Sequence, residues 1–259
     1  MRFAILSAVV AVAALFTQSE AVDLFIQSEG LERKATCSTD ILSCSTTTLD
    51  TCCSPKHGLL VLAQQWVPGK GPRDAFTMHG LWPDTCSGAQ VPIRECDASR
   101  SYNGLDNILY NYDYDQLYDN MTTYWPSEGR SNNWFWTHEW QKHGICVSTL
   151  APKCYGSEYK RYQDVHDYFK QALDLRTEYD LYAALDSAGI QPGSNPDDSE
   201  IHSAIRAAFG EDAMLQCDPH GDIREIRLYF HVKGKSQYVL TAPLETGSCQ
   251  GSVGYPEKY

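Results

Sequence analysis

Ten cysteines constrain the fold of this chain more than any other feature of its sequence. They are spread from Cys37 to Cys249, their number is even, and no two of them form a C-x-x-C pair. In an exported chain this spacing is typical of disulfides and not of zinc or redox sites, so we expect five disulfide bonds. The adjacent Cys52 and Cys53 cannot easily pair with each other and should tie the N-terminal segment to two different places. Spacing alone leaves the pairing open.

The first residues indicate export. Arg2 precedes an apolar run from Phe3 to Phe16, and Ser19-Glu20-Ala21 follows as a small-residue cleavage site, which is the pattern of a secretory signal peptide. The apolar run is too short to span a bilayer comfortably. We therefore predict a signal peptide over residues 1–21 and a mature chain over residues 22–259, secreted or delivered to a vacuole or lysosome, with no membrane contact.

The mature chain suits one domain with a sizeable core, because it shows no repeat, linker or second domain. Periodicity predicts a strand over 59–67, a second strand that starts at Phe76 and ends in His79-Gly80, and a hairpin formed by 223–232 and 238–242. It predicts helices over 105–117, 134–146 and 200–209, and two more within 159–188. We expect Ser199 to cap the helix over 200–209 and Gly210 to end it. A sequon predicts a glycosylation site at Asn120.

The stretch from Trp134 to Cys146, WFWTHEWQKHGIC, concentrates chemically active side chains. In a helix, Glu139 and His143 share one face, and His138 and Lys142 share the adjacent one. The simplest alternative is a surface amphipathic helix with Trp134, Phe135 and Trp140 in the core. That alternative does not explain why a potential acid, base and cation stand within six residues.

A zinc protease helix is disfavoured by spacing. The H-E-x-x-H motif needs histidines four apart, but Lys142 stands four residues after His138, and His143 falls at the fifth. A lysine at the ligand position would repel a metal. We therefore expect an acid–base site without metal or cofactor.

A second histidine lies in FTMHGLWPD, residues 76–84. Gly80 suggests close backbone approach or an unusual dihedral, and Trp82-Pro83-Asp84 is expected to turn the chain away. The alternative is a strand that ends in a structural histidine.

The two histidine segments together resemble the active-site segments of the secreted acid ribonucleases of the T2 family. The resemblance covers essentially the whole mature chain, the Gln65-Trp66 pair precedes both motifs, and the cysteine arrangement resembles the fungal branch. It implies a single disulfide-rich α+β domain whose central, largely antiparallel sheet is flanked by helices. The pairings that it implies are Cys37–Cys53, Cys44–Cys86, Cys52–Cys154, Cys96–Cys146 and Cys217–Cys249.

Cleavage of RNA without a metal fits these residue types independently. The 2′-hydroxyl of the substrate is the nucleophile, so one group must take its proton and another must protonate the departing 5′-oxygen. The resemblance implies that His143 is the base, His79 the acid and His138 the phosphate binder, with Glu139 and Lys142 stabilising the transition state. Acid and base could be exchanged without any visible change in the sequence.

The resemblance also implies two base pockets and low base specificity. One involves Trp82 and Asp84; the other involves Gln65, Pro126, Ser127 and Phe135. Two glutamines are unusual in a buried strand, so either Gln64 and Gln65 face solvent and a hydrogen-bonding neighbour, or one points into a cleft.

A formal net charge of −12 is the wrong sign for tight binding of RNA. Near pH 4 to 5 many carboxylates approach half-protonation while histidines are charged, so repulsion falls, which favours an enzyme of acidic surroundings. We expect a monomer whose partner is RNA. The alternatives are a non-enzymatic cytotoxic, lectin-like or RNA-binding protein on the same fold, and a metal-dependent secreted hydrolase.

Overall fold

The computed structural model describes residues 37–259 except 39, 47–49 and 113–115. The predicted signal peptide, residues 1–21, lies outside the described residues. Five strands form one antiparallel sheet in the order β2-β1-β4-β3, and β5 also pairs with β4. The strands are β1 Leu59–Gln65, β2 Thr77–Asp84, β3 Met214–Cys217, β4 Ile223–Lys233 and β5 Gln237–Thr241. The predicted C-terminal hairpin is β4 with β5.

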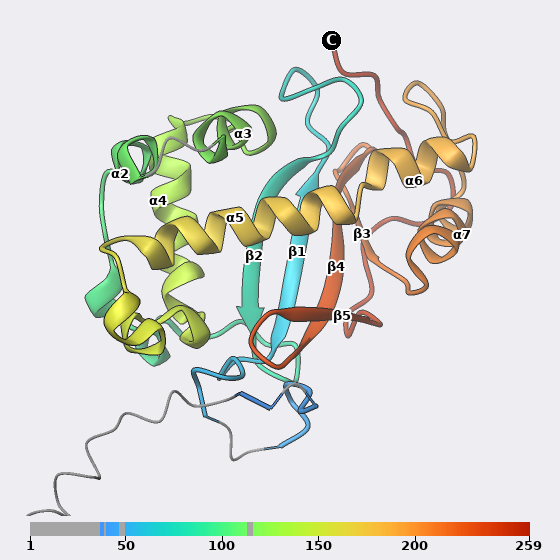
Figure 1. The fold of residues 1–259 in the computed structure, drawn as a ribbon. Helices are drawn as coiled ribbons and strands as arrows, with labels where there is room; N and C mark the ends of the chain where they lie inside the picture. The colour runs from blue at the N-terminus through green and yellow to red at the C-terminus, as the bar shows by residue number, and fades with distance from the viewer. Residues whose placement is uncertain (1–36, 39, 47–49, 113–115) are drawn as a thin grey trace, which may run out of the picture. The chain divides into compact units, whose positions relative to one another are not determined.

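Helices cover one face of this sheet and also lie beside its two lateral edges. They are α2 Leu105–Tyr112, α3 Leu117–Tyr124, α4 Asn132–Lys142, α5 Gln163–Glu178, α6 Leu181–Ser187 and α7 Asp198–Phe209. In Figure 1, α5 crosses in front of the sheet, α2 to α4 gather beside β2, and α6 and α7 lie on the opposite side. The prediction of a single α+β domain with an antiparallel sheet flanked by helices is confirmed.

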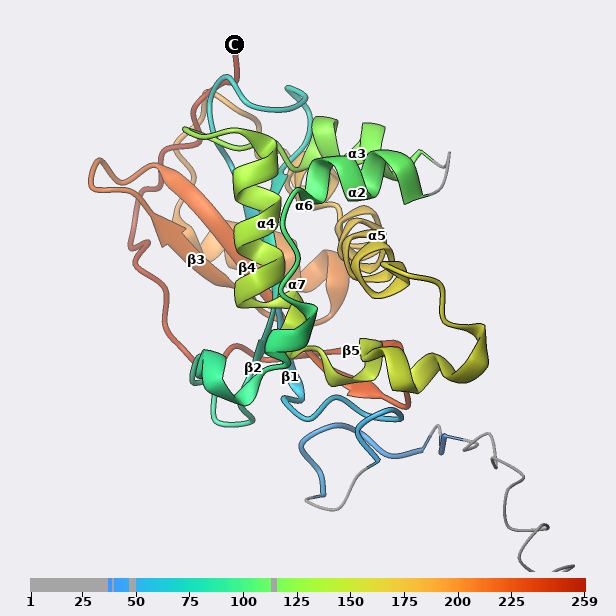
Figure 2. The ribbon, with the colours of Figure 1, turned by 90° about the vertical axis from the view of Figure 1, so that its left-hand side faces the viewer.

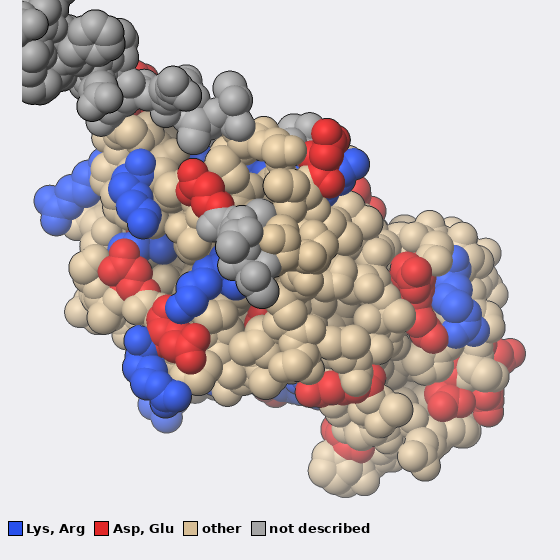
Figure 3. All heavy atoms as spheres, turned by 90° about the horizontal axis from the view of Figure 1, so that it is seen from below, with Lys and Arg blue, Asp and Glu red and all other residues tan. Residues whose placement is uncertain are grey.

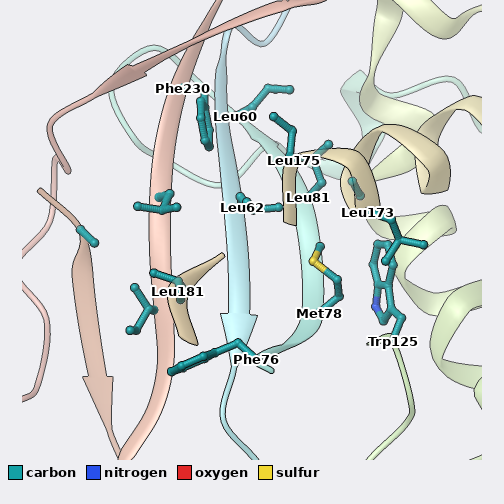
Figure 4. Close-up of a cluster of buried hydrophobic side chains, with 14 of the residues drawn as sticks. Leu60, Leu62, Phe76, Met78, Leu81, Trp125, Leu173, Leu175, Leu181 and Phe230 are labelled. Carbon is teal, nitrogen blue, oxygen red and sulfur yellow. The ribbon is translucent and has the colours of Figure 1, made fainter. Parts of the chain in front are cut away.

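The main core lies between the sheet and α5. Side chains alternate across a strand, so Leu60 and Leu62 of β1 point to the same face and meet Leu173 and Leu175 of α5 (Figure 4). These side chains are nearly or completely buried, and each stabilises the fold by roughly 1.5–3 kcal/mol. The opposite face of β1 presents Val61, and that face carries the site described below.

The five disulfides join Cys37 to Cys53, Cys44 to Cys86, Cys52 to Cys154, Cys96 to Cys146 and Cys217 to Cys249. These are the pairs that the family resemblance implies. Cys52 and Cys53 do bond different partners, as their adjacency suggests.

Three local predictions were wrong. Pro83 does not turn the chain away, because β2 is an edge strand that continues to Asp84, and an edge tolerates a residue without an N–H. The helix predicted over 105–117 is α2, which ends at Tyr112, and a further helix, α3, begins at Leu117. Asp197, not Ser199, caps α7: its carboxylate accepts the amide of Ser199, and Glu200 completes a capping box. Gly210 ends the helix as predicted, at φ 88°.

Among the described residues, none of the helices is long and apolar enough to cross a membrane.

Candidate active site

A β-bulge aims His79 into the site. On β1, Ala63 pairs with Gly80 and the next residue, Gln64, pairs with Met78, so His79 is the extra residue of β2. Bulges of this kind bend a strand and redirect a side chain. Gly80 is required by close approach: a Cβ there would lie 2.1 Å from Nε1 of Trp82 and 2.3 Å from Oε2 of Glu139.

Glu225 of β4 holds the ring of His79. Its Oε2 accepts a hydrogen bond from Nδ1 of His79 at 2.5 Å, and its Oε1 accepts one from Nε of Arg227 at 2.5 Å. Because Nδ1 is bound to a carboxylate, Nε2 of His79 is left to face the substrate. The sequence is silent on this contact, which spans 146 residues.

Helix α4 supplies the other candidate catalytic side chains. Ser131 caps it by accepting the amide of Trp134, and the helix ends at His143. Phe135, Trp136 and Trp140 fix it in the core. Figures 1 and 2 place α4 beside β2, the strand that carries His79.

As expected from helical spacing, Glu139 and His143 share one face of α4, which is buried, and His138 and Lys142 share another, which is exposed. Glu139 is 1% exposed and His143 6%, whereas His138 and Lys142 are exposed. Trp82 donates from Nε1 to Oε2 of Glu139 at 2.9 Å. Trp134 is not in the core, as the amphipathic alternative would have it, but is 48% exposed.

The two candidate proton-transfer groups have opposite pKa shifts. Burial lowers the pKa of His79, but the hydrogen bond and charge of Glu225 outweigh it, so this pKa lies above its ordinary value. Burial, and then the charges of Lys142, His138 and His79, lower the pKa of His143 to about 3. These shifts favour the protonated form of His79 and the neutral form of His143.

Two further groups are shifted mainly by burial. Burial raises the pKa of Glu139 to about 7, so on the acid side of neutrality its carboxyl is neutral and does not repel a phosphate. Burial, Lys142 and His79 lower the pKa of His138, and an arriving phosphate anion would oppose that shift.

These residues share one cavity of about 250 Å³. Seven of its lining residues are ones singled out in the sequence: His79, Trp82, Asp84, His138, Glu139, Lys142 and His143. The structure therefore brings together all five proposed catalytic residues and the first proposed base pocket.

Three charged or titratable side chains contact the indole ring of Trp82. His143 stacks on the indole with ring centroids 5.3 Å apart, His79 meets it edge-on at 5.0 Å, and the guanidinium of Arg227 lies 5.0 Å from its centroid. A base that stacks there must share the ring with these groups. Burial and then Glu245 raise the pKa of the neighbouring Asp84 to about 7, against the opposing charge of Arg227.

The second proposed base pocket does not line this cavity. Gln65 is buried, and its amide donates to the carbonyl of Met78 at 3.2 Å, while Gln64 donates to the carbonyl of Tyr179 at 2.9 Å. Neither glutamine faces solvent. Ser127 is buried in the loop before α4, Pro126 precedes it half-buried, and the ring of Phe135 lies 5.9 Å from that of His79.

Sequence reasoning missed the contribution of β4. Glu225, Arg227 and Tyr229 alternate along this strand and therefore lie on one face, where Arg227 and Tyr229 line the cavity. The signal was present, because two charged residues at i and i+2 interrupt an apolar strand. Gln90 and Glu245, from two loops, also line the cavity and carried no such signal.

The fold and this cavity define a candidate acid–base site that holds two imidazoles with opposite pKa shifts. The model of the Ribonuclease T2 family matches residues 39–242. Ribonuclease Rh of Rhizopus niveus is 48% identical over 225 residues, covering 86% of this chain and 93% of that protein. Ribonuclease M of Aspergillus phoenicis is 39% identical, covering 86% and 98%. The crystal structure of Actibind, described as a T2 ribonuclease, is 37% identical with a TM-score of 0.80, covering 86% and 98%.

This chain belongs to the ribonuclease T2 family. Its similarity to ribonucleases of Rhizopus and Aspergillus places it with the fungal branch, as its cysteines suggest.

Proposed function

We propose that this protein is a secreted, metal-independent acid endoribonuclease that cleaves single-stranded RNA with low base specificity. The observation that carries the proposal is that His79 and His143 flank Trp82 in one cavity while their pKa values are shifted in opposite directions. A reaction that needs a proton acceptor and a proton donor at once is suited to such a pair.

In the first step, neutral His143 takes the proton of the 2′-hydroxyl, whose oxygen attacks the phosphorus. Protonated His79 donates to the 5′-oxygen as its bond to phosphorus breaks, which leaves a 2′,3′-cyclic phosphate. In the second step His79 takes a proton from water, the water oxygen attacks, and His143 returns a proton to the 2′-oxygen to give a 3′-phosphate. Each histidine ends as it began.

Negative charge gathers on the non-bridging phosphate oxygens in both transition states. Lys142 and protonated His138, at the exposed rim of the cavity, supply cations there, and the neutral carboxyl of Glu139 offers an O–H donor. For the bases we propose one pocket at Trp82 and Asp84 and a second at Gln65, Pro126, Ser127 and Phe135. Stacking on aromatic rings tolerates any base, which supports low specificity.

Export is supported by the five disulfides and by the N-terminal pattern of the sequence. Glycosylation of Asn120 is compatible with its exposed place on α3. We propose that the protein acts as a monomer, since the residues of the proposed mechanism line one cavity without a contribution from a second copy.

The test is a digest of RNA at acid pH in EDTA, with DNA of the same sequence as control. RNA cleavage should persist in EDTA, the cyclic phosphate should precede the 3′-phosphate, and DNA should stay intact because it lacks the 2′-hydroxyl. Loss of activity in EDTA would favour the metal-dependent alternative, and absence of any cleavage would favour the non-enzymatic one.

A further inference from the structure

Four exposed side chains recur every four residues along α4 and the turn that precedes it: Arg130, Trp134, His138 and Lys142. We call this set the α4 rail. Residues four apart lie above one another on a helix, so Trp134, His138 and Lys142 form one stripe about 12 Å long. Arg130, which precedes the helix, extends this stripe through its contact with Trp134. The lower half of the rail, His138 and Lys142, borders the catalytic cavity, and its upper half lies outside the cavity.

The upper half is ordered by contacts within the rail. The rings of Trp134 and His138 are stacked with centroids 5.3 Å apart and an interplanar angle of 9°. The guanidinium of Arg130 lies 5.2 Å from the centroid of Trp134. The amide of Arg130 also donates to Oγ of Ser127 at 3.1 Å, which fixes the backbone at this end.

Trp134 is exposed in a chain that otherwise buries its tryptophans. Four of the six are at most 1% exposed and Trp82 is half-buried, whereas Trp134 is 48% exposed. Packing therefore does not account for a tryptophan here. An exposed aromatic ring beside a histidine that we propose to bind phosphate is suited to a stacked base, which would share the ring with His138 and Arg130.

The charge of the rail is not cancelled by its own helix. The single acidic residue of α4, Glu139, is 1% exposed and turned toward Trp82. Glu128, close to Arg130 in sequence, is paired with Arg224. The rail is thus a local cationic and aromatic strip on a protein of net charge −12, and on the face seen in Figure 3 acidic and basic side chains are instead interspersed.

We propose that the α4 rail is a single-strand binding site on which RNA continues past the nucleotides at the scissile bond, one base stacking on Trp134 and one phosphate pairing with Arg130. This rests on the proposed ribonuclease function and deepens it: the substrate class is polymeric RNA rather than dinucleotides. Phosphates met along the rail would then be passed toward His138 and Lys142.

The test compares kcat/KM for a six-nucleotide RNA with that for a dinucleoside phosphate, which has no nucleotide beyond the two at the scissile bond. In the wild type the longer substrate should be favoured. In Trp134→Ala that preference should fall about tenfold or more, mainly through KM, because stacking on an aromatic ring is lost. Trp134→Phe should keep most of the preference, and Lys170→Ala, on α5 against the other face of the sheet, should keep all of it.

A second measurement isolates the proposed phosphate contact. A six-nucleotide 2′-O-methyl RNA, which lacks the nucleophile, is titrated against wild type and Arg130→Ala at several salt concentrations. Loss of one phosphate contact should reduce the slope of log K against log salt by about 0.7. A purely structural role of Arg130 would not move this slope.

The outcomes separate the two proposals. If wild type cleaves both substrates, but Trp134→Ala loses equally on both and Arg130→Ala keeps the wild-type slope, the rail is wrong and the ribonuclease function stands. If wild type cleaves neither substrate, the proposed function falls, and the rail falls with it.

Discussion

Glu225 accepts the Nδ1 hydrogen of His79 at 2.5 Å, and by this contact a strand near the C-terminus sets the protonation of the proposed acid. The carboxylate has two effects. It fixes which ring nitrogen faces the substrate, and it raises a pKa that burial alone would lower.

Glu225→Gln should therefore move the basic limb of the rate–pH profile to lower pH. Glutamine can keep the hydrogen bond but not the charge, so His79 loses its proton more easily. On the basic side of the optimum, each unit by which this pKa falls should lower kcat about tenfold. Rate–pH profiles, with an NMR titration of His79, are the measurement; Glu178→Gln, at the C-terminal end of α5, is the control. A basic limb that stays in place would show that Glu225 has no part in this titration.

His79→Ala and His143→Ala should each lower kcat by roughly 10² to 10⁴-fold, since each removes a proton-transfer partner. In both variants KM should change much less than kcat. His166→Ala, on α5, serves as the control and should keep wild-type kinetics. Near-native turnover in His143→Ala would contradict its assignment as the base.

The wild-type profile itself should be bell-shaped and peak on the acid side, at roughly pH 4 to 6. Below the optimum His143 becomes protonated and cannot accept, and above it His79 loses its proton. The limbs belong to the coupled cluster of His79, His138, Glu139 and His143 and not to single residues. A rate that is flat through neutrality would contradict control by this cluster.

Gly80→Ala should destabilise the fold by about 1–3 kcal/mol, the usual cost of overpacking. The new methyl group would occupy the space of the hydrogen bond between Trp82 and Glu139. Gly129→Ala is a matched control, because a Cβ at Gly129 has no described atom within 4 Å. Thermal unfolding of both variants is the measurement, and equal melting temperatures would contradict the close approach at Gly80.

Burial of Glu139 should make the protein less stable as pH rises. Its folded pKa is raised from 4.5 to about 7, so the folded state binds the proton more tightly than the unfolded state between these values. Stability from this group is present below about pH 4.5 and is lost by roughly 3 kcal/mol up to about pH 7. In Glu139→Gln the fall in unfolding free energy over this range should be smaller. A variant curve parallel to that of the wild type would contradict the raised pKa.

The sequence was informative where chemistry is local. His138, Glu139, Lys142 and His143 lie within six residues at the C-terminal end of α4, so helical spacing sufficed to predict their grouping. Joining His79 to them required the resemblance to a family, because nothing in residues 76–84 states which helix their strand will meet.

The missed features depend on contacts distant in sequence. Glu225 lies 146 residues from His79, and only the register of β1 with β4 and β2 brings them together. Pro83 looks like a strand terminator until β2 is known to be an edge. Trp134 looks like a core residue until Phe135, Trp136 and Trp140 are seen to fill the core without it.

The disulfides fall into two groups, and none of them links the N-terminal group of cysteines to the C-terminal pair. Four disulfides lie within residues 37–154, and the ring closed by Cys52 and Cys154 contains all five proposed catalytic residues. The fifth closes a separate ring, Cys217–Cys249, around β4. A proteolytic cut in the loop between α6 and α7 would therefore leave two pieces with no covalent link between them. The β1–β4 ladder, further backbone hydrogen bonds such as those of Ser43 with Val232 and of Trp66 with Arg224, and side-chain packing would hold them together. The two fragments could be oxidised separately and then mixed in a complementation assay. The N-terminal fragment, which holds the proposed catalytic residues, would regain from β4 the carboxylate of Glu225 that orients His79.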